Sequence, residues 1–515
     1  MVRVPVTKLG TLCCLLFTCT FACTLAQAQV VTLLFTNDLE SAYDPVEAWW
    51  RDDTEQLGGI AQLATLISQT RAAATTAFLF DAGDIFTGTL AKRTRGAVAF
   101  DLMSAMDYDA MVIGNHEFEY GWQVLAKQKN RVAFPVLGAN LFYKDTQHPF
   151  AQPWAIIERN GVRVGVIGVM GRDAATALIP SNIAGLDVHD PVEVVRQHVN
   201  TLRAEVDLIV VLTHQGPTAP MQTDKEADPE VQRGNAANLA LAGAVPGIDV
   251  IFSGHTDAGT PEPLRHPDTG TVVMQTFGQG QNLGWLQIDL SGKQEPQGKL
   301  IHVRTRSLEP DPTVSARLAQ YRQQHPDLYQ VAGSTTLPMT RRYYRESSIG
   351  SLLADILAQA SGAPIGLMPS GALRKDLPGG EVRKVDLLDT FPFEDRVGVV
   401  EVSGALLKQI IEQGLSLERG ILQVSGLQVE YNPIAPAGER ITQLLVQGQP
   451  VKDQHTYQVA TLEILVQGGD SYIQFTDARL VRWLDQPYSQ VLTNYFRDHP
   501  NLQPPASGRL VRTDG

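Results

Sequence analysis

Residues 31–43 read VTLLFTNDLESAY, an apolar run that ends abruptly in a polar cluster containing Asp38 and Glu40. In an extended chain, residues i and i+2 point to the same side, so both carboxylates would face one spot at the mouth of a strand. Two carboxylates repel each other unless a cation lies between them. The stretch therefore predicts a buried strand with a cation site at its end.

Similar apolar runs recur between residue 30 and about residue 310 and alternate with helix-like stretches. Most are continuous rather than alternating, which is typical of strands covered on both faces. The pattern predicts an α/β domain built in layers. The runs are VVTLLF (30–35), TAFLFDAG (76–83), DAMVIGN (109–115), VRVGVIGVMG (162–171), DLIVVLTH (207–214), DVIFSGH (249–255) and TVVMQTF (271–277).

The remainder of the chain predicts a second domain, because 515 residues are too many for one hydrophobic core. Residues 309–332 are polar and contain several prolines, which indicates a linker helix between a first domain at 29–308 and a second at 333–510. In the second domain, SLLADILAQASG (351–362) is helix-like, and VGVVEVSGALLKQIIEQGL (397–415) is typical of a strand followed by a helix.

Residues 1–28 resemble a secretory signal peptide: a start with Arg3 and Lys8, an apolar core, and a small-x-small site at 26–28. A buried first helix and a lipoprotein cut before Cys23 are the alternatives. We therefore expect an exported protein, periplasmic or extracellular. Beyond this segment no apolar stretch reaches 18 residues, so no transmembrane helix is expected after it.

Composition excludes several classes of function. The chain has four cysteines, all of them within residues 1–28, so neither thiolate catalysis nor cysteine metal ligands are expected. Its formal net charge of −13 argues against general binding of nucleic acids. A small anionic substrate remains compatible with this charge if arginines or metal ions are present locally. The sequence does not determine the oligomeric state.

Five short blocks each end an apolar run with Asp, Asn or His, often beside Gly. The ends of strands are where ligands bind in a layered α/β fold. A single block of this kind is more often an ordinary turn or a core histidine, but five in one domain are not explained as turns alone. The blocks are TNDLE (36–40), DAGDIFTG (81–88), IGNHEFEYG (113–121), LTHQG (212–216) and SGHTDAG (253–259).

Together the blocks supply carboxylate, amide and imidazole groups, the usual ligands of Mn, Fe, Mg or Zn. The set is too large for one ion but suits two, which can share a bridging carboxylate and hold a hydroxide between them. The candidate residues are Asp38, Glu40, Asp84, Asn115, His116, His214, His255 and Asp257.

In this order the blocks resemble those of the calcineurin-like metallophosphoesterases, and GNHEF, LTHQG and the chain length resemble the 5'-nucleotidase branch. The resemblance covers about residues 30 to 475. It implies a four-layer metallophosphoesterase β-sandwich with flanking helices, followed by a C-terminal α/β substrate domain. It also implies an exported hydrolase with two divalent metal ions, for which Mn, Zn, Mg and Fe are candidates.

The resemblance also implies roles for the residues of the blocks. Asp84 would bridge both ions and Asp38 would bind the first. The second ion would be bound by Asn115, His214 and His255. His116 would face the phosphate as proton donor or transition-state stabiliser.

Three positions of the first domain depart from the family pattern. Glu40 and Asp257 stand where the family has neutral ligands of the first metal, so both changes add negative charge there. Glu119 replaces an aspartate and can still orient the imidazole of His116. We therefore expect Asp38, Glu40, Asp84 and Asp257 to form an all-oxygen first site.

In the second domain, YYRESSIGSLLAD (343–355) and MPSGALRKD (368–376) resemble family blocks in which Arg345 and Arg374 would bind phosphate. Arginine suits this task because its planar fork binds two oxygens at once. Phe393 and Tyr472 stand where the family clamps a nucleobase between aromatic rings. Pro369 replaces the family's base-contacting asparagine.

The resulting functional prediction is an exported phosphoesterase that hydrolyses nucleoside 5'-monophosphates or related nucleotides to nucleoside and phosphate. A hydroxide bridging the two ions would attack phosphorus in line. The alternatives within the superfamily are 2',3'-cyclic nucleotides, nucleotide sugars and a sulfur ester on a carrier protein. An alternative of another class is a non-catalytic protein that binds nucleotides or metal.

Overall fold

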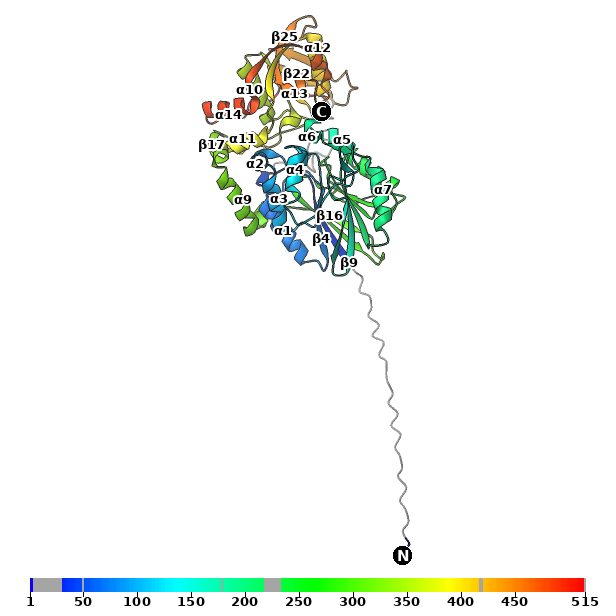
Figure 1. Cartoon of the computed structure of the whole chain (residues 1–515). Coiled ribbons are helices and arrows are strands. Elements are labelled where there is room, and N and C mark those ends of the chain that lie inside the picture. Colours follow the sequence, from blue (N-terminus) through cyan, green and yellow to red (C-terminus); the bar gives the residue numbers. More distant parts are fainter. Residues whose placement is uncertain are drawn as a thin grey trace.

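A computed structural model describes residues 1–2, 30–48, 51–176, 178, 180–216, 233–415 and 420–513. The predicted signal peptide lies, apart from its first two residues, outside this range. The described part of the chain forms two units, one above the other in Figure 1. The first carries the blue to green colours and the second the yellow to red ones. No helix within the described part is long and apolar enough to span a lipid bilayer.

Two six-stranded sheets build the first unit, and all seven apolar runs of the sequence are strands in them. In spatial order the first sheet contains β16 (Gln297–His302), β15 (Asn282–Asp289), β1 (Val30–Thr36), β4 (Ala77–Asp81), β5 (Ala110–Val112) and β6 (Val136–Leu137). The second contains β13 (Leu264–Arg265), β14 (Val272–Met274), β12 (Val250–Gly254), β11 (Leu208–His214), β9 (Val162–Met170) and β8 (Trp154–Arg159).

The two sheets face each other across an apolar core, in which the rings of Phe35 and Phe252 stack with centroids 4.1 Å apart. Residues of β1 and β11 are almost completely buried because helices cover the outer faces of both sheets. The predicted four-layer sandwich is therefore confirmed. The helices of this unit are α1 (Ile60–Ala72), α2 (Gly88–Thr94), α3 (Ala97–Ala105), α4 (Trp122–Gln128), α5 (Arg172–Thr176), α6 (Pro180–Ile183), α7 (Pro191–Leu202) and α8 (Arg233–Ala244).

The predicted linker contains α9 (Pro312–Gln324), which packs against α1 and α3 of the first unit (Figure 1). Asp311 caps this helix, because its side chain accepts a hydrogen bond from the backbone N–H of Val314. Pro312 follows at the first helical position, where a missing N–H costs nothing.

A five-stranded sheet forms the centre of the second unit, and helices cover it. Its strands are β21 (Leu422–Ser425), β18 (Ile365–Pro369), β25 (Thr456–Leu462), β20 (Arg396–Ser403) and β26 (Arg479–Pro487). A second sheet contains β24 (Gln449–Pro450), β23 (Ile441–Val446), β22 (Leu427–Tyr431) and β27 (Leu510–Arg512). The helices are α10 (Ser348–Ser361), α11 (Lys384–Thr390), α12 (Gly404–Gly414), α13 (Glu463–Val466) and α14 (Tyr488–Asp498).

Three two-stranded ribbons complete the fold of the described part of the chain. They are β2 (Pro45–Glu47) with β3 (Gln56–Gly58), β7 (Leu141–Tyr143) with β10 (Leu186–Val188), and β17 (Val331–Thr335) with β19 (Gly380–Arg383).

Candidate metal centre and active site

The polar blocks come together because β1, β4 and β5 run parallel in one sheet and β11 and β12 run parallel in the other. Their carboxyl ends lie at one edge of the sandwich. Several side chains there project from left-handed backbone: φ is 48° at Asp38, 61° at Asp84, 85° at His255 and 52° at Asp257. Such residues cost about 1–3 kcal/mol each and cluster at functional sites. The chain tolerates this strain at the place where donor atoms converge.

Among the residues that the structure describes, three donors lie close enough to share a metal ion: one ligand atom each of Asp84, His214 and His255, all within 4.8 Å of one another. His214 Nε2 is 2.9 Å from Asp84 Oδ2 and 3.1 Å from Asn115 Oδ1. The other ring nitrogen, Nδ1, is 2.8 Å from the carbonyl oxygen of Ala82. This backbone contact fixes the ring so that Nε2 faces the cluster, as in histidines that bind metals.

The predicted first site is a group of buried carboxylates. Asp38 and Asp257 are 2% and 6% exposed, and Asp257 Oδ1 has no hydrogen-bond partner among the described residues. Burial, with Asp84 nearby, raises the pKa of Asp38 to about 7 although His214 opposes the shift. Burial and the carboxylates of Asp38 and Glu40 raise the pKa of Asp257 well above its usual range. A group of this kind is a natural site for cations.

Glycines leave the space that these donors use. A Cβ atom at Gly114 would collide with Asp84, one at Gly254 with Asp38 and His214, and one at Gly278 with Asp257. The donor chemistry, the buried carboxylate oxygen of Asp257 and this glycine cradle all fit divalent metal ions.

His116 lies beside the cluster without belonging to it. Its Nε2 atom is 4.0 Å from Asp84 Oδ2, and its Nδ1 atom is 3.4 Å from Glu119 Oε2. Burial alone would lower the pKa of His116, but Asp84 and Glu119 outweigh it and raise the pKa to about 10. In the metal-free protein the imidazole is therefore held in its protonated form and can donate a proton.

Glu117 was missed by the sequence analysis although it stands next to His116. Its carboxylate is completely buried and accepts hydrogen bonds from the backbone N–H groups of Asp84, Ile85, Phe86 and Gly114, at 2.9, 2.8, 3.1 and 2.7 Å. It thus ties the loop after β4 to the loop after β5. A charged residue between His116 and the apolar Phe118 was the only signal for this role in the sequence.

Replacing Glu117 with glutamine should loosen both loops, because its amide group presents N–H donors to backbone N–H donors. A buried N–H without an acceptor costs about 1–3 kcal/mol, so we expect a loss of that size in the free energy of unfolding of the metal-free protein. Metal affinity should fall too. Denaturant unfolding and metal titration measure both. Glu158→Gln, which changes an exposed side chain, is the control and should alter neither quantity. If Glu117→Gln left both the free energy of unfolding and the metal affinity unchanged, Glu117 would not tie the two loops together.

The second unit contributes to the site differently from what the sequence predicts. Arg374 Nη2 is 2.6 Å from Glu40 Oε1, so this predicted arginine reaches the first unit. Arg345 is exposed and does not line the cavity between the units. Arg341 lines that cavity and donates to Gln279 Oε1 at 3.0 Å. The phosphate-binding role of Arg345 stays a prediction.

The predicted aromatic clamp is not assembled in this structure. Tyr472 is 3% exposed and packs in one hydrophobic cluster of the second unit, whereas Phe393 packs at the edge of another, beside Phe391. The ring of Tyr472 therefore has little free surface on which a base could stack. Base stacking by this pair stays a prediction that requires Tyr472 to move.

Metal binding should depend on pH, because a metal must displace protons. Burial alone would lower the pKa of His214, but the Asp84 carboxylate outweighs this effect, and the pKa rises from 6.5 to about 10. In the metal-free protein, the bound proton on His214 contributes to the free energy of unfolding. This contribution is fully present below pH 6.5 and is lost as the pH rises through about 10. We therefore expect the melting temperature of chelated protein to fall between about pH 7 and 9.5, and the gain from added Mn²⁺ to grow over that window. Scanning calorimetry checks this; a gain independent of pH would contradict it.

Comparison with known proteins agrees with this geometry. The calcineurin-like phosphoesterase model matches residues 31–258, and the model of the 5'-nucleotidase C-terminal domain matches residues 330–477. A 5'-nucleotidase from Diplobatis ommata is 26% identical over 571 aligned positions, which cover 99% of this chain and 95% of the relative. Protein UshA from Yersinia enterocolitica is 26% identical over 524 positions, which cover 92% of each chain.

Solved structures share the whole architecture. The 5'-nucleotidase precursor from Thermus thermophilus has a TM-score of 0.78 at 25% identity, covering 95% of this chain and 100% of that one. The sulfate thiohydrolase SoxB from Thermus thermophilus shares the fold, with a TM-score of 0.77 at 19% identity over 94% of this chain and 97% of that one. With metal donors at the strand ends of its first unit, the chain belongs to the 5'-nucleotidase family of metal-dependent phosphoric ester hydrolases, a calcineurin-like phosphoesterase domain followed by a 5'-nucleotidase C-terminal domain.

Proposed function

We propose that this enzyme is exported and hydrolyses nucleoside 5'-monophosphates or related nucleotides to nucleoside and phosphate with two divalent metal ions. The observation that carries the proposal is the convergence of Asp84, His214 and His255 beside His116, with Arg374 reaching the same place from the second domain. Relatives named 5'-nucleotidase that match over nearly the whole chain support this substrate class.

Each part of the proposed site has a task in phosphoester hydrolysis. Bound divalent ions supply Lewis acidity and lower the pKa of water so that a nucleophile exists at neutral pH. Asp38, Asp84 and Asp257 would hold one ion, and Asp84 with Asn115, His214 and His255 the other. Glu40, which the sequence predicts at the first ion, is instead paired with Arg374. Arg374 binds phosphoryl oxygens through its planar fork.

His116 and Glu119 complete the proposed mechanism. Protonated His116 donates a proton or a hydrogen bond to the phosphate ester as charge develops on its oxygens. Glu119, 3.4 Å from Nδ1, orients the ring and stabilises its charge. The substrate's base and sugar would contact the second domain, where Phe393 and Tyr472 are the proposed aromatic residues.

A substrate panel on metal-reconstituted protein tests the proposal. The chelated protein is reloaded with Mn²⁺ or Zn²⁺, and phosphate release is followed from AMP and other 5'-monophosphates. Product formation is followed by chromatography for a 2',3'-cyclic nucleotide, a nucleotide sugar and a sulfur ester, whose hydrolysis releases no free phosphate. We expect the 5'-monophosphates to give the highest kcat/KM, with Mn²⁺ more effective because the first site offers only oxygen ligands. A preference for another ester would show that this ester, and not a nucleoside 5'-monophosphate, is the substrate class. Nucleotide binding without turnover would indicate a binding protein.

Export is tested separately. Expression of the full chain followed by cell fractionation should place the protein outside the cytoplasm, shortened by about the length of residues 1–28. A full-length protein that remains in the cytoplasm would contradict this part of the proposal.

A further inference from the structure

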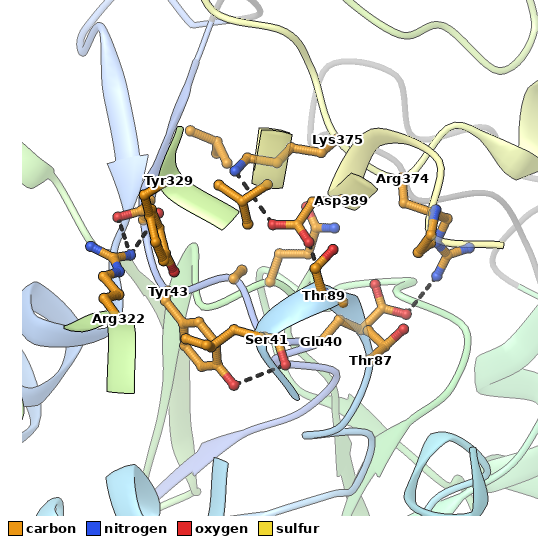
Figure 2. Close-up of a pocket in the computed structure, with 18 of the residues that line it drawn as sticks. Glu40, Ser41, Tyr43, Thr87, Thr89, Arg322, Tyr329, Arg374, Lys375 and Asp389 are labelled. Carbon is orange, nitrogen blue, oxygen red and sulfur yellow. Dashed lines mark hydrogen bonds and ion pairs between the residues drawn. The ribbon is translucent and has the colours of Figure 1, made fainter. Parts of the chain in front are cut away.

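Glu40 lies between the catalytic histidine candidate and the arginine of the second domain. Its Oε1 atom is 2.6 Å from Arg374 Nη2 and 3.6 Å from His116 Nε2. The pair joins residues 334 positions apart in the sequence and spans the two domains. Figure 2 shows Arg374 pointing down from the second domain toward the Glu40 carboxylate, and Thr87 lines the same cavity.

The surroundings hold both partners in this arrangement. The Glu40 side chain is 6% exposed, and its backbone N–H donates to the Asp84 carbonyl at 2.9 Å. The backbone N–H of Arg374 donates to the Thr390 carbonyl at 2.9 Å, and its own carbonyl accepts from Arg341. An ion pair shielded from water in this way is stronger than a surface pair, because solvent screens it less.

A phosphoryl oxygen bound by both His116 and Arg374 would have to lie within hydrogen-bond distance of both, at about 2.7–3.2 Å. Glu40 Oε1, 2.6 Å from Arg374 Nη2 and 3.6 Å from His116 Nε2, lies at the edge of that region and blocks it. Two anions at one place repel each other. A phosphate can therefore bind there only if Glu40 gives up Arg374.

We propose that Glu40 is a resident anion that takes the place of a phosphoryl oxygen between His116 and Arg374 and competes with phosphate for that arginine. This proposal rests on the proposed phosphoesterase function of the same site. Competition weakens the binding of substrate and product alike, and it therefore speeds the departure of phosphate. Glutamate is required for this effect, since a neutral side chain would not compete for a guanidinium.

The test is the dissociation constant of inorganic phosphate for the full-length, metal-loaded protein, measured by calorimetry. Glu40→Gln keeps the shape and removes the charge. A charge-assisted hydrogen bond contributes roughly twice as much as a neutral one, so we expect Glu40→Gln to bind phosphate about tenfold more tightly. Weaker or unchanged binding would overturn the proposal, because Glu40 would then merely orient Arg374 or have no effect.

An Arg374→Gln background separates competition from simple repulsion. If Glu40 acts by holding Arg374, adding Glu40→Gln to Arg374→Gln should change phosphate affinity less than about twofold. A tenfold gain that persists without Arg374 would show general charge repulsion and overturn the proposal. Metal content is measured in every variant, and loss of metal from Glu40→Gln would show that Glu40 is a ligand and would overturn it too.

Glu394→Gln is the matched control. Glu394 forms another ion pair between the domains, with Lys92 at 2.6 Å, but its side chain is 62% exposed. Its replacement should leave phosphate affinity unchanged. This test measures phosphate binding, whereas the substrate panel measures turnover. If the proposed nucleotide specificity is wrong, only the substrate panel shows it, and the phosphate-binding result can still be interpreted.

Discussion

Turnover of a His116→Ala variant should fall by roughly 10²–10⁴-fold, while bound metal stays near the wild-type amount. The imidazole lies beside the cluster of Asp84, His214 and His255, but the structure does not group it with those donors. Its pKa is raised to about 10 by Asp84 and Glu119 against the effect of burial, so the ring can donate a proton. The measurement is kcat with metal analysis of the same sample.

Two comparisons make this result specific. His148→Ala removes an exposed histidine of the same domain and should change neither turnover nor metal content. Glu119→Gln should have a smaller effect than His116→Ala, because it removes the charge that orients the ring but leaves the ring. If His116→Ala loses metal in step with activity, His116 is a ligand and its assignment as proton donor is wrong.

Much of the first domain follows from local sequence. Continuous apolar runs such as VVTLLF and DLIVVLTH are typical of strands buried on both faces, and each ends in residues suited to turns. Because ligands bind at strand ends in layered α/β folds, the blocks were expected to meet, and the resemblance to the metallophosphoesterases implied that Asp84, His214 and His255 share an ion. The structure brings these donors together within 4.8 Å.

Contacts between the domains could not be derived in the same way. Nothing in the sequence near Glu40 indicates that its partner is Arg374, because the contact depends on how the two domains dock. The choice between Arg341 and Arg345 has the same origin: the two residues stand four positions apart, and only the fold decides which one lines the cavity. The burial of Tyr472 likewise depends on tertiary packing, which a sequence motif does not reveal.

Glu117 illustrates a third kind of difficulty. Its four backbone donors come from two loops about thirty residues apart, so its role is set by loop conformation and not by side-chain partners. A glutamate in an apolar context is the only local sign, and exposed glutamates are far more common than buried ones.

Replacing Asp84 with asparagine should have an effect at least as large as the loss of His116, but through the metals. Asp84 is 2% exposed, and its Oδ1 atom accepts from the backbone N–H of His116 at 2.8 Å while Oδ2 is 2.9 Å from His214 Nε2. Burial would raise its pKa, but His214 and His116 keep it below its usual range, so the group is ionised at neutral pH. Asparagine keeps the size but removes the charge and one acceptor.

Loss of a residue that only orients a ligand costs about 10–100-fold in metal affinity, so removal of the ligand shared by both proposed sites should exceed about 100-fold and abolish turnover at ordinary metal concentrations. Metal titration of the chelated variant measures this, with circular dichroism to confirm folding. Asp81→Asn is the matched control, because Asp81 is buried at the end of β4 but accepts from the Thr36 hydroxyl and the backbone N–H of Gly83, outside the donor cluster. Asp81→Asn should therefore retain metal. If both variants lose metal equally, the loss reflects damage to the end of β4; if Asp84→Asn retains both ions, Asp84 does not bridge them.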